Sequence, residues 1–111
     1  MRQGGDLVGE TQTVPVPGPS GPVQIQIVIN RDGASRPVEV FIHGVRGRDR
    51  SMTNALGRIV SLALAGGIPA DAVSRTLSGI GGEDPPVWWN GTQIRSIPDA
   101  VAKVLAPRGD G

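Results

Sequence analysis

The chain has 111 residues and a formal net charge of +1, which is enough for one domain with a modest core and gives no reason to expect a membrane or a nucleic acid polymer as partner. It contains no cysteine, which excludes disulfides, thiolate metal sites and thiol redox chemistry, and its single histidine argues against a zinc site. The first ten residues lack the apolar stretch of a signal peptide, so we expect a cytoplasmic protein without metal or cofactor.

The N-terminal segment, residues 1–22, is predicted to be a flexible tail. It is rich in Gly, Pro, Thr and Ser, and prolines interrupt any continuous helix or strand ladder. These prolines are Pro15, Pro17, Pro19 and Pro22.

Two strands are predicted after this segment. From Val23 to Asn30 every second residue is apolar, and the same alternation returns from Val38 to Ile42 after a turn at Asp32-Gly33. The pattern predicts a two-stranded antiparallel hairpin. Such a hairpin is marginal alone and needs helices on its apolar face or a partner's strand at its edge.

Two helices follow the hairpin. The first is predicted from Ser51, taken as its cap, to the Gly66-Gly67 pair, and the second follows Pro69 and stops at Gly79 to Gly82. The stripe of the first helix expected to face the core consists of Met52, Leu56, Ile59, Val60 and Ala63.

A third helix is predicted to start at Ser96, with Asp99 completing a capping box. Before it, Asn90-Gly91 after Trp88 and Trp89 predicts a small hairpin. The predicted fold class is α+β: an antiparallel hairpin or small sheet packed on two to three helices and completed by oligomerisation. The domain spans residues 23–106 and is followed by a C-terminal tail, residues 107–111.

Three segments of the sequence together resemble the TSCPD domain, found near the C-terminus of adenosylcobalamin-dependent ribonucleotide reductases. They are RPVEVFIHG, TNALGRIVSLALAGGIPADAVSRTLSGI and RSIPDAVAKVL, and the resemblance covers Val23 to Leu105. The namesake motif reads Thr-Ser-Cys-Pro-Asp in the family, whereas Arg95 and Ile97 replace its first and third members here. Because ribonucleotide reduction needs cysteines, the resemblance implies a standalone accessory domain rather than a reductase, and we expect no enzymatic activity.

A cluster of arginines precedes the first helix. Arg46, Arg48 and Arg50, with two glycines, lie directly before a helix start, where backbone amides and guanidinium groups suit a phosphate. The same residues are also consistent with a solvated loop that binds no ligand and whose arginines pair with nearby carboxylates, among them Asp49.

Trp88 and Trp89, followed by Asn90 as a third candidate binding residue, add aromatic faces on which a base can stack. Adjacent tryptophans also serve to close a core or a dimer contact. Arg95, between this loop and the third helix, is predicted either to clamp a phosphate or, if buried, to hold loop carbonyls.

Two functions are therefore consistent with the sequence. The first is a non-catalytic module that binds a nucleotide or nucleotide-derived phosphate ligand, and a narrower version is a phage protein that sequesters a nucleotide second messenger of host immunity. The second is an assembly module that docks on a ribonucleotide reductase or on another copy of itself, with the N-terminal tail as tether. A homo-oligomer is expected in either case.

Overall fold

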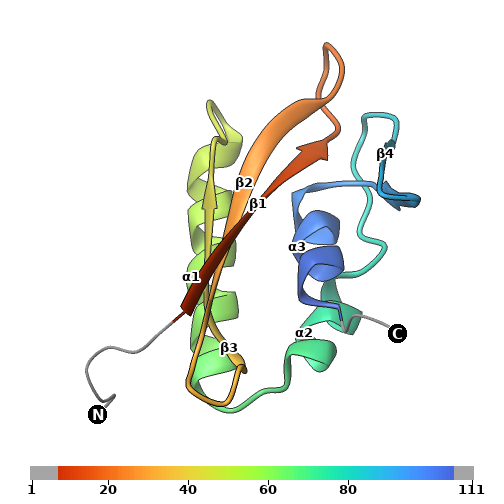
Figure 1. Ribbon diagram of the computed structural model, residues 1–111. Coiled ribbons are helices and arrows are strands. Elements are labelled where there is room, and N and C mark those ends of the chain that lie inside the picture. Colours follow the sequence, from red (N-terminus) through yellow and green to blue (C-terminus); the bar gives the residue numbers. More distant parts are fainter. Residues whose placement is uncertain (1–7, 107–111) are drawn as a thin grey trace.

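A three-stranded antiparallel sheet with the spatial order β1-β2-β3 forms the centre of the fold (Figure 1). The structure is a computed structural model and describes residues 8–106. Its strands are β1 (Val8–Val16), β2 (Val23–Arg31), β3 (Pro37–His43) and a separate pair, β4 (Val87–Trp89) and β5 (Thr92–Ile94). Its helices are α1 (Asp49–Ala65), α2 (Ala70–Leu77) and α3 (Ile97–Leu105), so the predicted α+β class is confirmed.

The predicted hairpin is formed by β2 and β3. Ile27 pairs with Ile42 and Ile29 with Val40, and these side chains lie on the buried face of the sheet. In the turn, the Asp32 carboxylate accepts hydrogen bonds from the backbone N–H groups of Ala34 and Arg36 at 2.9 and 3.0 Å. The period-two pattern and the turn chemistry both predicted this element correctly.

Strand β1 shows that the prediction of a flexible tail is wrong over Val8–Val16. The strand pairs along its whole length with β2, and Val14, opposite Ile25, is fully buried. β1 lies at the edge of the sheet, where a proline costs no ladder bond if its nitrogen faces away from the neighbouring strand, so Pro15 does not prevent pairing. The remaining prolines of this segment belong to the β1–β2 connection, and residues 1–7 and 107–111 lie outside the described part of the chain.

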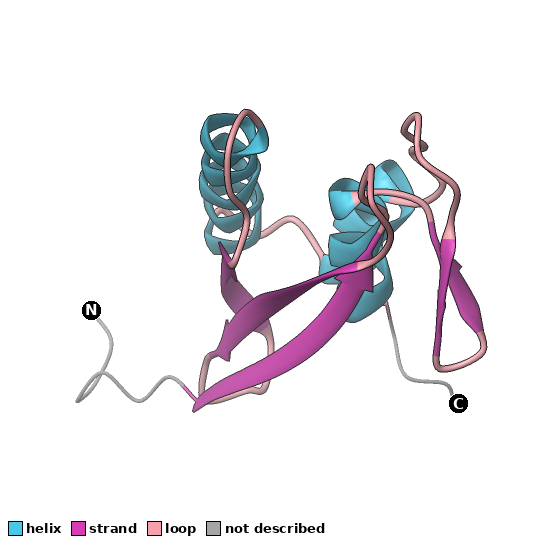
Figure 2. Ribbon diagram, turned by 90° about the horizontal axis from the view of Figure 1, so that it is seen from above, coloured by secondary structure: helices cyan, strands magenta, loops and turns pink. Residues whose placement is uncertain are grey.

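The helices cover one face of the sheet (Figure 2). α1 packs against β3, α3 contacts β1 and β5, and α2 packs against α3. The core between these layers is built mainly from Ile25, Ile27, Ile29, Val40, Val60, Leu64, Ile94, Val101 and Leu105. Within residues 8–106, no helix combines the length and the apolar character needed to cross a membrane.

The face that α1 presents to the core differs from the predicted stripe. Thr53, Gly57, Val60 and Leu64 are buried, whereas Met52 and Ile59, both expected in the core, are exposed.

This orientation follows from a close approach of α1 to β3. The Ser61 hydroxyl accepts a hydrogen bond from the Val40 N–H at 2.9 Å and donates one to the Val40 carbonyl at 3.1 Å. A Cβ placed on Gly57 would lie only 3.4 Å from the same carbonyl oxygen. Small residues of α1 therefore lie closest to β3, and Met52, Ile59 and Leu62 are turned outward.

Candidate functional site

The arginine loop, residues 44–50, comprises the connection between β3 and α1 and the first two residues of α1. Arg46, Arg48 and Arg50 are all exposed, and none of them forms an ion pair with another residue of the described chain. Two carboxylates near this loop in the sequence are engaged elsewhere: Asp32 pairs with Arg36 at 3.2 Å, and Glu39 accepts a hydrogen bond from Asn30. The guanidinium groups of this loop are thus available to a ligand.

The start of α1 has no side-chain cap. Arg48 occupies the N-cap position, and its side chain makes no hydrogen bond to the first amides. Ser51 lies two residues inside the helix, so the prediction that it caps α1 is wrong. The first N–H groups of α1 therefore lack a capping side chain. The three arginines beside them attract anions, and Asp49 is the carboxylate of the same turn.

The tryptophan hairpin, β4 and β5, has the predicted geometry. Asn90 and Gly91 at its turn have φ of 51° and 80°, the left-handed conformation of a tight hairpin turn. Trp89 packs against the core, whereas Trp88 is 68% exposed. The two indoles thus have different environments, and Trp88 alone offers an open face.

Within one copy of the chain, the arginine loop and the tryptophan hairpin are not brought together. The loop follows β3 and the hairpin contacts β1, and these strands are opposite edges of the sheet (Figures 1 and 2). Of three cavities of about 640 Å³ each, none is lined by the arginines or tryptophans of these two elements. The predicted combination of guanidinium groups and indoles in one concavity is therefore not formed, because the width of the sheet separates them.

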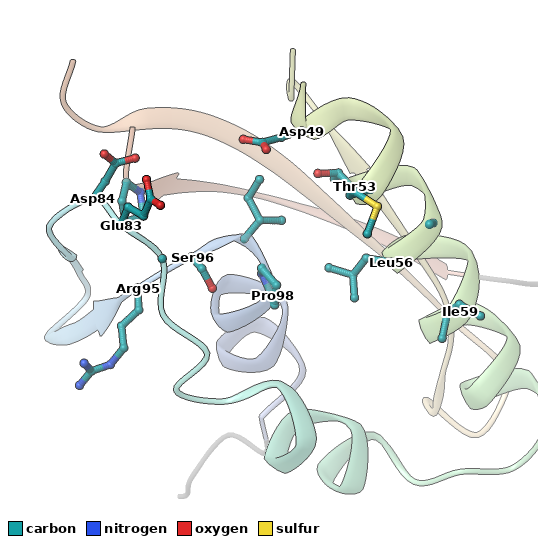
Figure 3. Close-up of a pocket in the computed structure, with 14 residues that line it drawn as sticks. Asp49, Thr53, Leu56, Ile59, Glu83, Asp84, Arg95, Ser96 and Pro98 are labelled. Carbon is teal, nitrogen blue, oxygen red and sulfur yellow. The ribbon is translucent and has the colours of Figure 1, made fainter. Parts of the chain in front are cut away.

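Arg95 joins β5 to α3 and lines the groove between α1 and α3. Its guanidinium points away from the groove (Figure 3), and the residue is exposed. Only its backbone has a structural role: the Arg95 N–H donates to Asp99 Oδ2 at 2.9 Å. A buried arginine that holds loop carbonyls is thus excluded.

Asp99 has a larger structural role than the capping box that the sequence predicts. It is fully buried, and besides the Arg95 N–H it accepts hydrogen bonds from the Gly79 N–H at 2.8 Å and from Lys103 Nζ at 2.6 Å. Burial raises the pKa of this carboxyl, but the hydrogen bonds from Lys103, Gly79 and Arg95 outweigh it and hold the pKa below the ordinary aspartate value.

Asp99 therefore fastens the end of α2 and the end of β5 to α3. Ser96 caps α3 as predicted, accepting from the Asp99 N–H at 3.2 Å, and also donates to the Ile80 carbonyl at 2.6 Å. The Asp99 carboxylate does not close the capping box. The position of an aspartate three residues after a capping serine was the signal available in the sequence.

The groove between α1 and the start of α3 has apolar walls and an acidic end (Figure 3). Its walls include Met52, Leu56, Ile59, Ile97 and Pro98. Around the end near the start of α1 lie Asp49, Glu83 and Asp84, which form no ion pair within residues 8–106. An apolar group fits this groove, whereas its carboxylates would repel a phosphate.

Side chains that catalysis or metal binding would need lie apart among the described residues. His43 and Asp49, which are close in sequence, line different cavities on two sides of α1. The described residues contain no group of three side chains able to hold a metal ion.

Comparison with known proteins agrees with the extent of this fold. Neither the curated proteins nor the solved structures contain a match to the chain. The sequence model of the TSCPD domain matches residues 6–108, a range that includes β1. Because this match covers nearly the whole chain and includes the Ser96, Pro98 and Asp99 positions, the chain belongs to the TSCPD domain family.

Proposed function

We propose that the chain is a non-catalytic binding module for a nucleotide or nucleotide-derived phosphate ligand, with the arginine loop as the phosphate contact. The observation that supports it is the set of three exposed, unpaired arginines beside the uncapped start of α1. Forked guanidinium donors and helix-start amides without a side-chain cap both favour phosphate oxygens.

The family supports the same proposal. TSCPD domains occur in ribonucleotide reductases, where nucleotides are the substrates, but this chain has no cysteine to carry or deliver electrons. Recognition without reduction is the function that remains. A narrower form of the proposal is a phage protein that sequesters a nucleotide second messenger of host immunity.

The test is calorimetry of the purified chain against a panel of adenosine triphosphate, cyclic nucleotides, ADP-ribose derivatives and inorganic phosphate. We expect Arg48→Ala to weaken binding of the preferred compound about tenfold or more. The melting temperature should stay within about 2 °C, because Arg48 is exposed and unpaired. Arg75→Ala, which removes an exposed arginine on α2, is the matched control and should bind normally. The proposal is contradicted if no compound of the panel binds, or if both variants lose the same amount of binding affinity.

The exposed Trp88 supports a second candidate, docking on a ribonucleotide reductase. Tryptophan is enriched among residues that dominate binding energy at protein interfaces, and Trp88 lies on a hairpin at the edge of the molecule (Figure 2). Biolayer interferometry with purified adenosylcobalamin-dependent reductase tests it. Trp88→Ala should abolish association, whereas Thr76→Ala, an exposed change on α2, should not.

A further inference from the structure

The outward face of α1 carries a row of largely exposed apolar side chains. Met52, Ile59 and Leu62 are 73, 63 and 69% exposed. With Ala55 they are spaced by three, four and three residues, which is the a/d spacing of a helix that packs against another helix. Exposed apolar rows that form one continuous face often mark a site of contact with another molecule.

The occupant of this face can be inferred from the rest of the chain. All large apolar side chains that are exposed on helices of the described residues belong to α1, while α2 and α3 pack against each other. We propose that α1 pairs antiparallel with α1 of a second copy, in an isologous contact across a two-fold axis. This inference goes beyond the proposed ligand and does not depend on it.

The sizes of the side chains match in this arrangement. In the antiparallel a/d register, Met52 packs against Leu62 of the partner subunit, and Ala55 against Ile59 of the partner subunit. The small alanine leaves room for the branched isoleucine, so that the two central layers each combine one small and one large side chain.

The charges also favour the antiparallel direction. The last turn of α1 holds no basic side chain, although cations stabilise the carbonyl end of a helix. Antiparallel pairing places the positive end of each α1 beside the last turn of α1 of the partner subunit, where those carbonyls end. Parallel pairing would instead put the arginines of both copies at the same end.

The surface area that α1 can bury is sufficient for a stable dimer only if the groove between α1 and α3 also contributes to the interface. A 17-residue helix is about 25 Å long and about 11 Å wide, so its face alone measures roughly 280 Å², about a third of the roughly 800 Å² that one partner of a standard interface buries. A helix seated beside α1 also reaches the far wall of the groove at Ile97 and Pro98. The dimer is therefore expected to be concentration-dependent rather than obligate.

Sedimentation equilibrium of the full chain over a wide concentration range tests the pairing. We expect a monomer–dimer equilibrium that Ile59→Glu weakens at least about tenfold, because it places a carboxylate in the apolar seam. Val8→Glu, at an equally exposed valine on β1, is the control and should leave the dimer unchanged. Circular dichroism melting confirms that both variants fold. A monomer at all concentrations, or a dimer indifferent to Ile59→Glu, overturns the proposal.

The absence of native cysteine allows the direction of pairing to be measured. Arg58 lies near the two-fold axis of the proposed register, so Arg58→Cys should be linked between copies by a short bismaleimide at concentrations where the dimer forms. Thr11→Cys, on the outer face of the sheet, should not be linked. Equal linking of both variants, or none at Arg58→Cys in a proven dimer, excludes this register.

Discussion

The junction before α3 and the start of α1 are both polar, but they differ in how their polar groups are used. At the junction, Asp99 is buried and receives three hydrogen bonds from three segments of the chain. At the start of α1, Arg46 and Arg48 are exposed and unpaired within the described chain, and the helix amides have no cap. Saturated buried groups hold a fold together, whereas unsatisfied exposed groups remain available for recognition.

This difference explains how the chain departs from its family motif. The retained members, Ser96, Pro98 and Asp99, are the ones that cap α3, open its first turn and fasten it to its neighbours. Of the two replaced members, Arg95 is exposed and Ile97 packs against the core. In this chain the three matching residues make the structural contacts, and the fold forms without the cysteine of the motif.

The largest effect is expected at the buried junction. Asp99→Ala leaves two backbone N–H groups and the Lys103 ammonium without their acceptor, and should lower the free energy of unfolding by about 3 to 5 kcal/mol. Urea unfolding followed by circular dichroism measures the loss. The control is Asp71→Ala, which removes an exposed pair with Arg75 and should cost less than about 0.5 kcal/mol. Similar losses in both variants would show that Asp99 does not fasten the junction.

The same carboxylate makes a prediction about pH. Because the pKa of Asp99 is lowered by folding, its contribution is complete above the unfolded value of about 4 and is lost as the pH falls through the lower native pKa. The wild-type chain should therefore lose stability below about pH 4, and Asp99→Asn should flatten this part of the curve. Parallel acid titrations of the two proteins, monitored by melting temperature, would reveal whether Asp99 contributes.

A smaller effect is expected in β1. Val14→Ala should lower the free energy of unfolding by about 2 kcal/mol, because Val14 is fully buried against Ile25. Thr13→Ala, on the exposed side of the same strand, should change it by less than about 0.5 kcal/mol. If both changes were neutral in urea unfolding, the segment would behave as the tail that its prolines suggested.

Most of the fold could be predicted because local patterns agree with the tertiary structure. The alternation from Val23 to Asn30, the turn at Asp32 and the Ser96 cap each formed as expected. β1 could not be predicted from its own residues, since a strand that contains proline is acceptable only at a sheet edge, and the edge is defined by β2.

The candidate site was less predictable, because it depends on which edges of the sheet its elements occupy. Nothing local in the arginine or tryptophan segments reveals that β1 and β2 separate them. Likewise, α1 has apolar residues on two of its faces, and the sequence does not show which face packs on the sheet. The close contacts of Gly57 and Ser61 with Val40 determine which face is buried. A glycine and a serine four residues apart were the sequence signal for that close approach.

The smallest predicted difference compares two serines that the sequence presents as equivalent helix caps. Ser96→Ala removes the cap of α3 and the bond to the Ile80 carbonyl, and should cost about 1 to 2 kcal/mol. Ser51→Ala lies inside α1, where alanine is the better helix former, and should be neutral or slightly stabilising. Thermal unfolding of both variants separates them. A loss at Ser51 equal to that at Ser96 would mean that α1 is capped after all, and its amides would then be less available to an anion.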